Sequence, residues 1–544
     1  MADTKATNQN SILHNRYFLY ATEFFSGMSV MAIELGASRL LAPYFSSSQI
    51  VWTVIIGMIM IAMALGNVWG GRMADKNPSP SKLYGRLLLA AVWTALIPFV
   101  GKYVIAGVSL VVAIFVEKNF LVWASMASCV VLFVFPLMLL GTVTPSLVKY
   151  TVSDLEQNGK IVGELEALNT IGSIIGTFVP TFVTIPSVGT AATFLIFAGV
   201  LALLAILYFI SAKKKRVVSA AALLLIAVLG TQTGAVSFAF ASDGLVYEGE
   251  SIYNYLQVQE DEERIWLSTN VLVGVQSIMR KEGGLTGMYY DYALAAPFLA
   301  GVPGKGGGEV LILGLGTGTY ALQCLNYFDG MRVEGVEIDE KIVKLSKEYF
   351  ELPKEVEVSV YDGRAYLAQA GSYDVIMVDA YQDITIPFQM STVEFFTQVK
   401  EHLKEDGVMV VNMNMRTDTD GGMNDYLCDT IASVFPEVYT VVVRGGTNME
   451  LFASENPEML RVLEEQLAAY SAEDTHDAEL ALMMSGVGQN LCEVTKGDYI
   501  LTDDKAPVEV LGMKVIDELI SEELAYYKDM IKNGNIGELI ELVR

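Results

Sequence analysis

Hydrophobic residues form two different patterns along the chain, one in each half. Before residue 243 they gather in long apolar runs, and runs of about 20 residues are typical of helices that span a membrane. A β-barrel would need alternating polar and apolar positions, which are absent from this half. The runs predict about seven spans, or eight if a shorter run at 103–116 also crosses. We place the seven at 17–42, 49–71, 84–101, 120–147, 164–187, 190–211 and 217–240.

The pattern changes after residue 243. Polar and apolar positions alternate between 244 and 300, which predicts a small antiparallel sheet. Farther along, short apolar runs alternate with helical segments, which predicts a doubly wound, mostly parallel, Rossmann-like α/β sheet. The expected domains are a transmembrane helical domain (1–243), a β subdomain (244–300), a Rossmann-like domain (301–520) and a C-terminal helix (521–544).

Charge separates the two halves as clearly as hydrophobicity does. The first 243 residues carry 15 Lys and Arg against 10 Asp and Glu, and the rest carry 21 against 52, giving the net charge of −26. An acidic domain repels phosphate backbones, so no nucleic-acid partner is expected. The four cysteines and three histidines form no CxxC or Cys/His pattern, so no metal site is expected.

Positive residues between the apolar runs help to predict which side of the membrane each connecting loop faces. Basic residues at 72–86 and the cluster Lys213–Arg216 both indicate the cytoplasmic side. If 217–240 also crosses, the acidic half lies outside. If instead 103–116 is a true span, the Lys213–Arg216 cluster moves outside, and the sequence leaves this open. Within the first run lie Glu23, Glu34 and Arg39, which fit either structural ion pairing or an ion or substrate path.

A glycine-rich segment follows the first apolar strand of the Rossmann-like domain. The strand 309–313 leads into Gly314, Gly316 and Gly318, and glycines here let the backbone approach a ligand beside a helix N-terminus. Glu337 ends the next strand, 19 positions after Gly318, where a carboxylate can accept both ribose hydroxyls. A dinucleotide motif requires a further glycine at the position of Thr319, so the pattern favours adenosylmethionine over NAD.

Acidic residues also end the following strands. Asp362, with Gly363 beside it, ends the third strand and Asp379 ends the fourth. Ligands of open α/β sheets bind beyond these strand ends, so we expect the acids to surround a nucleoside ligand. For any one of these acids a helix cap or a turn is the favoured interpretation, and it is their occurrence at successive strand ends that favours a ligand.

These motifs together resemble the membrane-fused branch of the spermidine synthase (polyamine aminopropyltransferase) family over about 244–510. A loop at Gly70–Asp75 is also similar to one in major-facilitator transporters. The stretches that carry the family resemblance are Tyr255–Val258, Val275–Ser277, Thr286–Asp291, the Gly314 loop, Val336–Asp339, Asp362–Gly363, Val378–Asp379, Phe388–Phe395 and Leu501–Glu509.

The resemblance implies transfer of an aminopropyl group from decarboxylated S-adenosylmethionine to a putrescine-like amine. It implies that Asp379 is the catalytic acid–base residue, that Glu337 binds the ribose and that Asp362 binds the adenine. The remaining donor-site residues would be Gln257, Gln276, Gly314, Gly316, Thr317, Gly318 and Gly363. The acceptor site would contain Tyr289, Tyr290, Asp291, Tyr381, Gln382 and Asp383.

Three departures from the family pattern, at Thr317, Gln382 and Tyr290, keep alternatives open, and Tyr290 stands where the family has His. Thr317 replaces an acid that in the family holds the cationic end of the donor, so a methyltransferase using intact S-adenosylmethionine is an alternative. Gln382 replaces a second acid. A polyamine transporter or sensor with a non-catalytic nucleoside-binding domain is the third possibility. We expect a multi-pass cell-membrane protein with its acidic half in the cytoplasm, where the cofactor is supplied, and by family analogy a homodimer.

Overall fold

The computed structural model of the protein describes residues 15–151, 158–240, 244–271, 274–380, 386–414, 420–445, 448–471 and 477–532. These residues form two compact units. The helical unit extends to Ser242 and includes the short segments Glu248–Tyr255 and Asn270–Leu272, and the α/β unit contains the rest. The domain boundaries expected at 243, 300 and 520 stay predictions.

The helical unit consists of long apolar helices joined by short connections. The run 103–116, considered above as a separate span, lies within helix α3 as far as Phe115. Gly189 with φ of +82° interrupts the helical stretch Gly159–Ser211. Its elements are α1 (Arg16–Phe45), α2 (Gln49–Lys76), α3 (Pro80–Phe115), α4 (Phe120–Cys129), η2 (Val130–Val134), α5 (Phe135–Gly141), α6 (Val143–Thr151), α7 (Asn158–Val179), η4 (Pro180–Thr184), α8 (Ile185–Ser211), α9 (Arg216–Thr231) and η5 (Thr233–Ala235).

Length and composition suit these helices to a bilayer. Within the described ranges, five helical stretches are long and apolar enough to cross a membrane, and the apolar helix Val217–Thr231 is shorter. The five are Arg16–Phe45, Gln49–Lys76, Pro80–Phe115, Phe120–Thr151 and Gly159–Ser211. The number of crossings stays a prediction.

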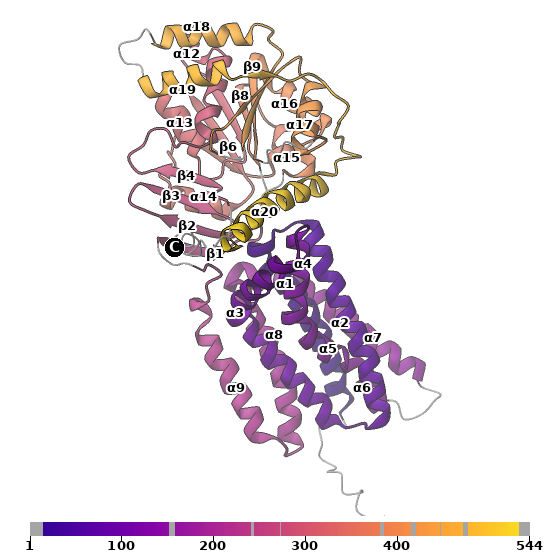
Figure 1. Cartoon of the computed structure of the whole chain (residues 1–544). Coiled ribbons are helices and arrows are strands. Elements are labelled where there is room, and N and C mark those ends of the chain that lie inside the picture. The colour runs from indigo at the N-terminus through magenta and orange to yellow at the C-terminus, as the bar shows by residue number, and fades with distance from the viewer. Residues whose placement is uncertain are drawn as a thin grey trace, which may run out of the picture. The chain divides into compact units, whose positions relative to one another are not determined.

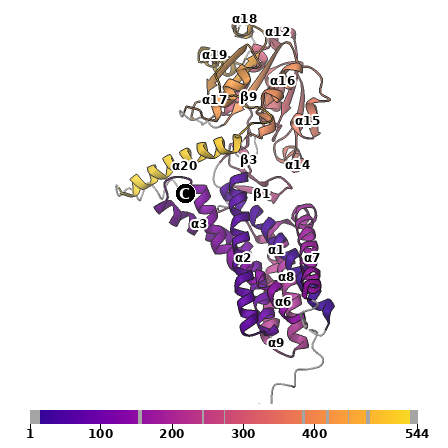
Figure 2. The same cartoon turned by 90° about the vertical axis from the view of Figure 1, so that its right-hand side faces the viewer.

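Glycines allow the helices of this unit to approach one another closely. A Cβ atom at Gly172 or Gly176 of α7 would collide with the backbone of Phe24 or Met28 in α1. At Gly66 of α2 it would collide with the carbonyl oxygen of Met138 and lie 2.9 Å from the Cα of Gly141. Small residues at such crossings are typical of helices packed in membranes. Figure 2 shows α1, α7 and α8 side by side.

One buried carboxylate joins three of the helices. Glu23 of α1 is fully buried, and its Oε1 accepts hydrogen bonds from Thr144 Oγ1 in α6 at 2.5 Å and Asn169 Nδ2 in α7 at 2.8 Å. Arg39 donates to the backbone carbonyls of Ser251 and Ile252. Glu23 and Arg39 therefore take part in packing contacts of the helical unit.

The α/β unit is built on an eight-stranded sheet with the strand order β12-β10-β11-β9-β8-β5-β6-β7. The five strands from β9 to β7 are parallel, and β11, β10 and β12 are antiparallel additions at one edge. The strands are β5 (Glu309–Leu313), β6 (Arg332–Glu337), β7 (Glu357–Val360), β8 (Tyr373–Val378), β9 (Leu403–Met413), β10 (Glu437–Val442), β11 (Met449–Ser454) and β12 (Cys492–Glu493).

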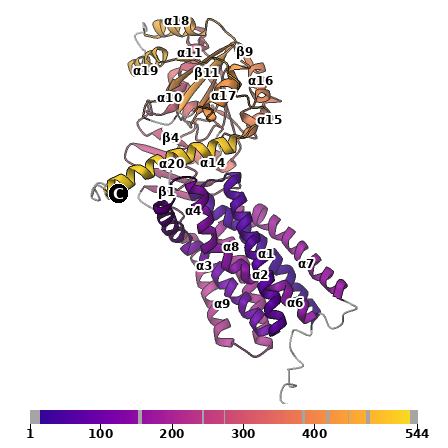
Figure 3. The same cartoon turned by 45° about the vertical axis from the view of Figure 1, so that its right-hand side comes forward.

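Helices cover both faces of this sheet, so its central strands are buried. Figures 1 and 3 show α18 and α19 on one side and α15, α16 and α17 on the other. This arrangement confirms the predicted Rossmann-like fold class. The helices are α10 (Tyr289–Ala293), α11 (Ala295–Leu299), α12 (Val302–Lys305), α13 (Thr319–Tyr327), α14 (Glu340–Tyr349), α15 (Gly363–Leu367), η6 (Phe388–Met390), α16 (Val393–Glu401), α17 (Met423–Ala432), α18 (Met459–Ser471), α19 (Ala478–Gln489) and α20 (Val508–Lys532).

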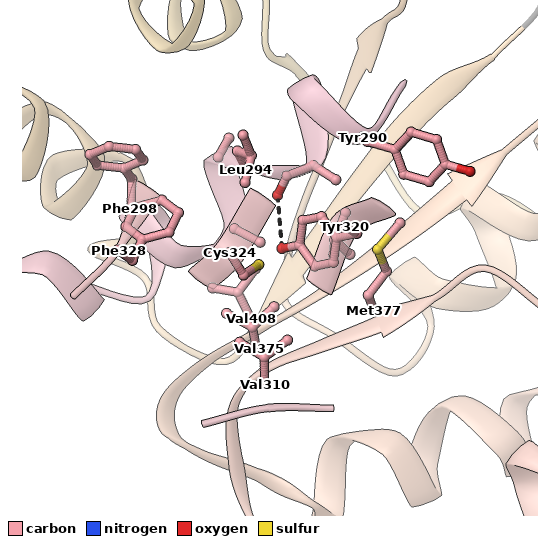
Figure 4. Packing of buried hydrophobic residues seen from close by; sticks show 14 of the residues in the cluster. Tyr290, Leu294, Phe298, Val310, Tyr320, Cys324, Phe328, Val375, Met377 and Val408 are labelled. Atoms are coloured by element: carbon pink, nitrogen blue, oxygen red, sulfur yellow. Dashed lines mark hydrogen bonds between the residues drawn. The ribbon is translucent and has the colours of Figure 1, made fainter. Parts of the chain in front are cut away.

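The main core of the unit lies between the sheet and the helices α10, α11, α13, α18 and α19. Val310, Val375 and Val408 line its sheet side, and Phe298 and Tyr320 line its helix side (Figure 4). Residues 310–313 of β5, 375–378 of β8 and 408–411 of β9 are apolar without alternation, as expected for parallel strands covered on both sides.

A second, four-stranded antiparallel sheet precedes the Rossmann-like sheet in the chain, as the alternating pattern predicts. Its order is β1-β2-β3-β4, with β1 (Leu245–Glu250), β2 (Tyr255–Glu260), β3 (Arg264–Ser268) and β4 (Ser277–Arg280). Leu256, Val258 and Leu267 of this sheet pack against Ile342 and Leu345 of α14. The packing places β4 next to the glycine loop after β5.

Helix packing in the helical unit gives a first test. Gly66→Ala should lower the melting temperature of the detergent-solubilised protein, because the added methyl group collides with α5 backbone. Gly57→Ala in the same helix is the control, since nothing lies within 4 Å of its Cβ position. Alanine favours a helix by about 1 kcal/mol over glycine, so the control should be neutral or stabilising. Equal melting temperatures for both variants would contradict the close approach.

Candidate active site

The candidate site begins at the C-terminal end of β5, the middle strand of the parallel sheet. Gly314 has φ of +92°, and a Cβ atom there would lie 2.7 Å from the Cα of Ala380 and overlap the Asp379 carbonyl oxygen. The backbone N–H of Gly314 donates to the Val336 carbonyl at 2.9 Å, and that of Asp379 donates to the Leu313 carbonyl at 2.9 Å. Only glycine fits here, and its turn lies between the ends of β6 and β8.

Glu337, at the end of β6, supports the glycine loop. Its Oε2 accepts the N–H of Gly316 at 3.0 Å, and its Oε1 accepts the N–H of Asp339 at 3.0 Å. Burial raises the pKa of the Glu337 carboxyl to about 7, although these two backbone N–H groups lower it. The carboxyl therefore lies beside the loop, and each oxygen retains a lone pair that can accept a ligand hydroxyl.

Thr317 closes the loop against the small sheet. Its side chain is buried, its N–H donates to Ser277 Oγ at 3.2 Å, and its Oγ1 lies 3.5 Å from Thr319 Oγ1. Thr319 Oγ1 in turn donates to the Ile278 carbonyl at 2.8 Å. The loop and β4 thus form one hydrogen-bonded structure, in which residue 317 contributes no charge.

Asp379 follows β8 and is held by two side chains. Tyr289 Oη donates to its Oδ2 at 2.6 Å, and Asn412 Nδ2 donates to its Oδ1 at 2.9 Å. Asp379 itself is of intermediate exposure. Desolvation raises the pKa of its carboxyl to about 7, while the two hydrogen bonds act to lower it. A group that ionises near neutral pH is suited to proton transfer.

The other predicted acceptor-site residues differ in their contacts. Tyr290 donates to the Gln276 carbonyl at 2.8 Å, which ties α10 to the segment before β4. Asp291 is buried and accepts from the N–H and Oγ1 of Thr286, from the N–H of Gly287, and from Gln323 Nε2 at 2.7 Å. The Asp291 carboxylate therefore holds the loop that leads into Tyr289.

The remaining predicted residues are placed as follows. Asp362 caps α15, with its Oδ1 accepting the N–H of Ala365 at 2.8 Å, and Gly363 follows it near Met390. Gln257 is buried in β2. Tyr381, Gln382 and Asp383 lie outside the described residues. In the described ranges, no group of three or more His, Cys, Asp or Glu side chains could hold a metal ion.

Two residues of this region escaped the sequence analysis. In the strand registers, Val378 pairs with Val411 and Asn412 pairs with Glu450, so Asp379, Asn412 and Glu450 follow one another across β8, β9 and β11. Glu450 is fully buried, and neither carboxyl oxygen has a hydrogen-bond partner in the described structure. An acid inside an otherwise apolar strand is the one sequence signal that could have identified it.

Sequence comparisons agree with this geometry. The profile of the spermine/spermidine synthase domain matches residues 298–455. A probable polyamine aminopropyl transferase of Bifidobacterium longum is 49% identical over 352 residues, which cover 62% of this chain and 78% of that relative. The chain belongs to the spermine/spermidine synthase family. The family resemblance seen in the sequence is therefore confirmed, and the relatives support a transferase.

More distant relatives of this spermidine synthase family member include two kinds of transferase. A polyamine aminopropyltransferase of Vibrio vulnificus is 28% identical over 225 residues, covering 40% of this chain and 73% of the relative. An N-terminal histidine N-methyltransferase of Emericella nidulans is 27% identical over 320 residues, covering 52% and 56%. The roles assigned to single site residues stay predictions.

The buried Glu450 generates a prediction about pH. Burial, together with the charge of Asp379, raises the pKa of the Glu450 carboxyl well above its ordinary value. The folded state thus keeps a proton that the unfolded state loses above about pH 4.5, so stability falls as pH rises from there. Glu450→Gln removes this penalty and should raise the melting temperature by about 2–4 °C or more at pH 8, and by less at pH 5.

Thermal unfolding of the full chain at the two pH values measures this difference. Glu464→Gln is a matched control, because Glu464 lies exposed on α18, and its effect should be the same at both pH values. A Glu450→Gln variant that is less stable at pH 8 than the unmodified chain would mean that Glu450 is ionised in the folded protein.

Proposed function

We propose that this chain transfers an aminopropyl group from decarboxylated S-adenosylmethionine to a putrescine-like amine, with Asp379 as its acid–base residue. The observation that carries the proposal is the Asp379 carboxyl, held by Tyr289 and Asn412 beside the glycine loop and partly open to solvent. Membership of the spermine/spermidine synthase family and the names of the relatives from Bifidobacterium longum and Vibrio vulnificus support it.

The chemistry requires a base beside the acceptor. The neutral nitrogen of the amine attacks the propyl carbon bonded to the sulfonium, and the carbon–sulfur bond breaks with its electron pair remaining on sulfur as a neutral thioether. The nitrogen gains a bond and must lose a proton, which the Asp379 carboxylate accepts. Tyr289 remains a hydrogen-bond donor throughout, because burial raises the pKa of its hydroxyl well above the ordinary value. The rest of the catalysis is positioning of the two substrates.

The donor fits the opposite side of the Gly314 turn. We assign the ribose hydroxyls to Glu337, whose two oxygens each already accept one backbone N–H and still have lone pairs free. Asp362 with Gly363 would face the adenine, and Gln257 and Gln276 would line the donor site from the small sheet. We assign Asp291 a positioning role, since three of its four hydrogen bonds hold the loop before Tyr289 and the fourth joins it to Gln323 of α13.

Orientation in the cell forms part of the same proposal. The five long apolar stretches anchor the chain in the cell membrane, and the α/β unit lies in the cytoplasm, where adenosylmethionine derivatives are made.

The Tyr381–Asp383 segment, which follows Asp379 closely in the sequence, would contribute to the amine site.

A second candidate function rests on Thr317. The buried Thr317 provides no negative charge to attract the cationic aminopropyl end of a decarboxylated donor or to repel the carboxylate of the intact one. A methyltransferase that uses intact S-adenosylmethionine is therefore the alternative, and the relatedness to an N-terminal histidine N-methyltransferase agrees with it.

Removal of the proposed base tests the first function. Asp379→Asn should lower kcat/KM for decarboxylated donor plus putrescine by about 10²–10⁴-fold, because the amide cannot accept the amine proton. Product formation by the full chain in detergent is the measurement. Glu464→Gln again serves as the exposed control. Undiminished activity in Asp379→Asn would remove Asp379 from the mechanism, and a wild-type chain inactive with every diamine would exclude aminopropyl transfer.

The hydrogen bond from Tyr289 gives a separate test through pH. Tyr289→Phe removes a donor that stabilises the ionised Asp379, so the pKa of this carboxyl should rise further above 7. The rise of kcat/KM with pH should then move to higher pH than in the wild type. Tyr366→Phe is the control, since Tyr366 bonds to Glu334 and should leave the profile in place. An unmoved profile in Tyr289→Phe would argue that Asp379 is not the titrating group.

Substitution of Thr317 separates the two donors. Thr317→Asp should strengthen binding of decarboxylated S-adenosylmethionine relative to the intact form, because the new carboxylate attracts an ammonium group and repels a carboxylate. Calorimetric titration of the full chain with both compounds measures the ratio of the two dissociation constants, and Thr317→Asn controls for the change of shape. A ratio that does not change in Thr317→Asp would show that residue 317 does not contact the end of the donor.

A further inference from the structure

A cavity of about 150 Å³ lies in the helical unit, where α2 ends and α3 begins. Three basic side chains line it: Lys76 at the end of α2, and Lys82 and Arg86 in the first turns of α3. The hydroxyl-bearing residues Ser146 and Tyr150 of α6 complete the opposite wall. A cavity needs only about 10–15 Å³ to hold one water, so this one has room for a polyatomic ion with several waters.

Arg86 is the most enclosed of the three cations, and its guanidinium is only partly paired. Its Nη2 donates to Ser146 Oγ at 3.0 Å, and its Nη1 lies 3.5 Å from the sulfur of Met73, a weak acceptor. Its Nε is buried and has no hydrogen-bond partner in the described structure. A buried Nε without an acceptor on a partly buried cation is costly unless an anion reaches it.

No carboxylate compensates this charge. The residues lining the cavity include no Asp or Glu, and no ion pair of Lys76, Lys82 or Arg86 occurs within the described ranges. The nearest acid in the sequence, Asp75, pairs with Lys149 at 3.0 Å. Lys215 Nζ lies 3.2 Å from the Cβ position of Gly85, which adds a fourth cation at this end of the unit.

We propose that this cavity binds an oxyanion of the phosphate type, held by Arg86, Lys76 and Lys82 with hydroxyl donors from Ser146 and Tyr150. Three cations require more negative charge than one carboxylate carries, and a tetrahedral oxyanion can accept from donors on several sides. A guanidinium offers a planar set of N–H donors that matches phosphate oxygens, and lysines add point charges. The Nε of Arg86 then gains the acceptor that the protein itself does not provide.

The position of the cavity allows the bound oxyanion to come from either of two sources. It lies where α2 ends and α3 begins, beside Ser146 and Tyr150 of α6, and Lys215 from the connection between α8 and α9 approaches Gly85 of α3. The headgroup of an acidic phospholipid reaches such a position from a bilayer, and a free phosphate reaches it from water. Both would use the same side chains, and the test distinguishes them.

The experiment uses the full chain in an uncharged detergent and follows its melting temperature. One arm adds inorganic phosphate against sodium chloride at equal ionic strength. The other adds a short-chain phosphatidylglycerol against the matching phosphatidylcholine. A ligand that binds only the folded state raises the melting temperature with concentration. We expect a rise in at least one arm, and a rise only with phosphatidylglycerol identifies a lipid headgroup.

Variants tie the effect to the cavity. Arg86→Gln should abolish the rise, whereas Arg72→Gln should retain it, because Arg72 is an exposed cation of α2 outside the cavity. If Arg86→Gln does not fold, Lys82→Gln replaces it: Lys82 is exposed, and its loss should weaken the apparent affinity several-fold. No rise in the wild-type chain, or an equal loss in Arg72→Gln, overturns the proposal. An unchanged titration in Lys82→Gln also overturns it.

Discussion

The close approach between Gly314 and the backbone of Asp379 is the constraint on which the candidate active site depends. Two neighbouring parallel strands, β5 and β8, end at this contact, and the absence of a side chain at 314 lets the chain turn there. The turn directs Gly316 toward Glu337 on one side and leaves Asp379 on the other. Any larger residue at 314 would push the glycine loop away from Asp379, so this one glycine keeps the proposed donor loop beside the proposed base.

Desolvation and hydrogen bonding oppose each other at both acids of the site. The pKa values of Glu337 and Asp379 are each raised to about 7 by burial, and each is restrained by two or more hydrogen bonds to the ionised form. The partners differ in kind. Backbone N–H groups hold Glu337, which is proposed to accept the ribose hydroxyls, whereas the side chains of Tyr289 and Asn412 hold Asp379, which is proposed to exchange a proton. Similar pKa values thus accompany different proposed roles.

The sequence predicted a site residue wherever the position of that residue in a single strand was enough to identify it. The acids Glu337, Asp362 and Asp379 could be located because each lies at or just after the end of a short strand-like run, and the parallel order followed from the alternation with helices. Asn412 and Glu450 could not be located, because Asn412 reaches Asp379 through the parallel pairing of β9 with β8, and Glu450 lies beyond Asn412 through the antiparallel pairing of β11 with β9. For Asp291 the opposite holds. A sequence motif identified the segment that contains Asp291, but only the structure shows that the loop's N–H groups donate hydrogen bonds to its carboxylate oxygens.

Because residue 317 is a threonine and not the acid usual in the family, any negative charge beside the proposed donor must come from residues outside the glycine loop. Its Oγ1 lies near Thr319 and its N–H is bonded to Ser277, so the threonine fastens the loop to the small sheet without adding charge. The carboxyls that the structure places around the loop are then Glu337 and Asp379, and both titrate near neutral pH because of burial. A cationic donor or acceptor entering beside them would favour their ionised forms. A cationic substrate in this site would therefore be attracted by the carboxylates and would, through the same interaction, keep the proposed base in its ionised form.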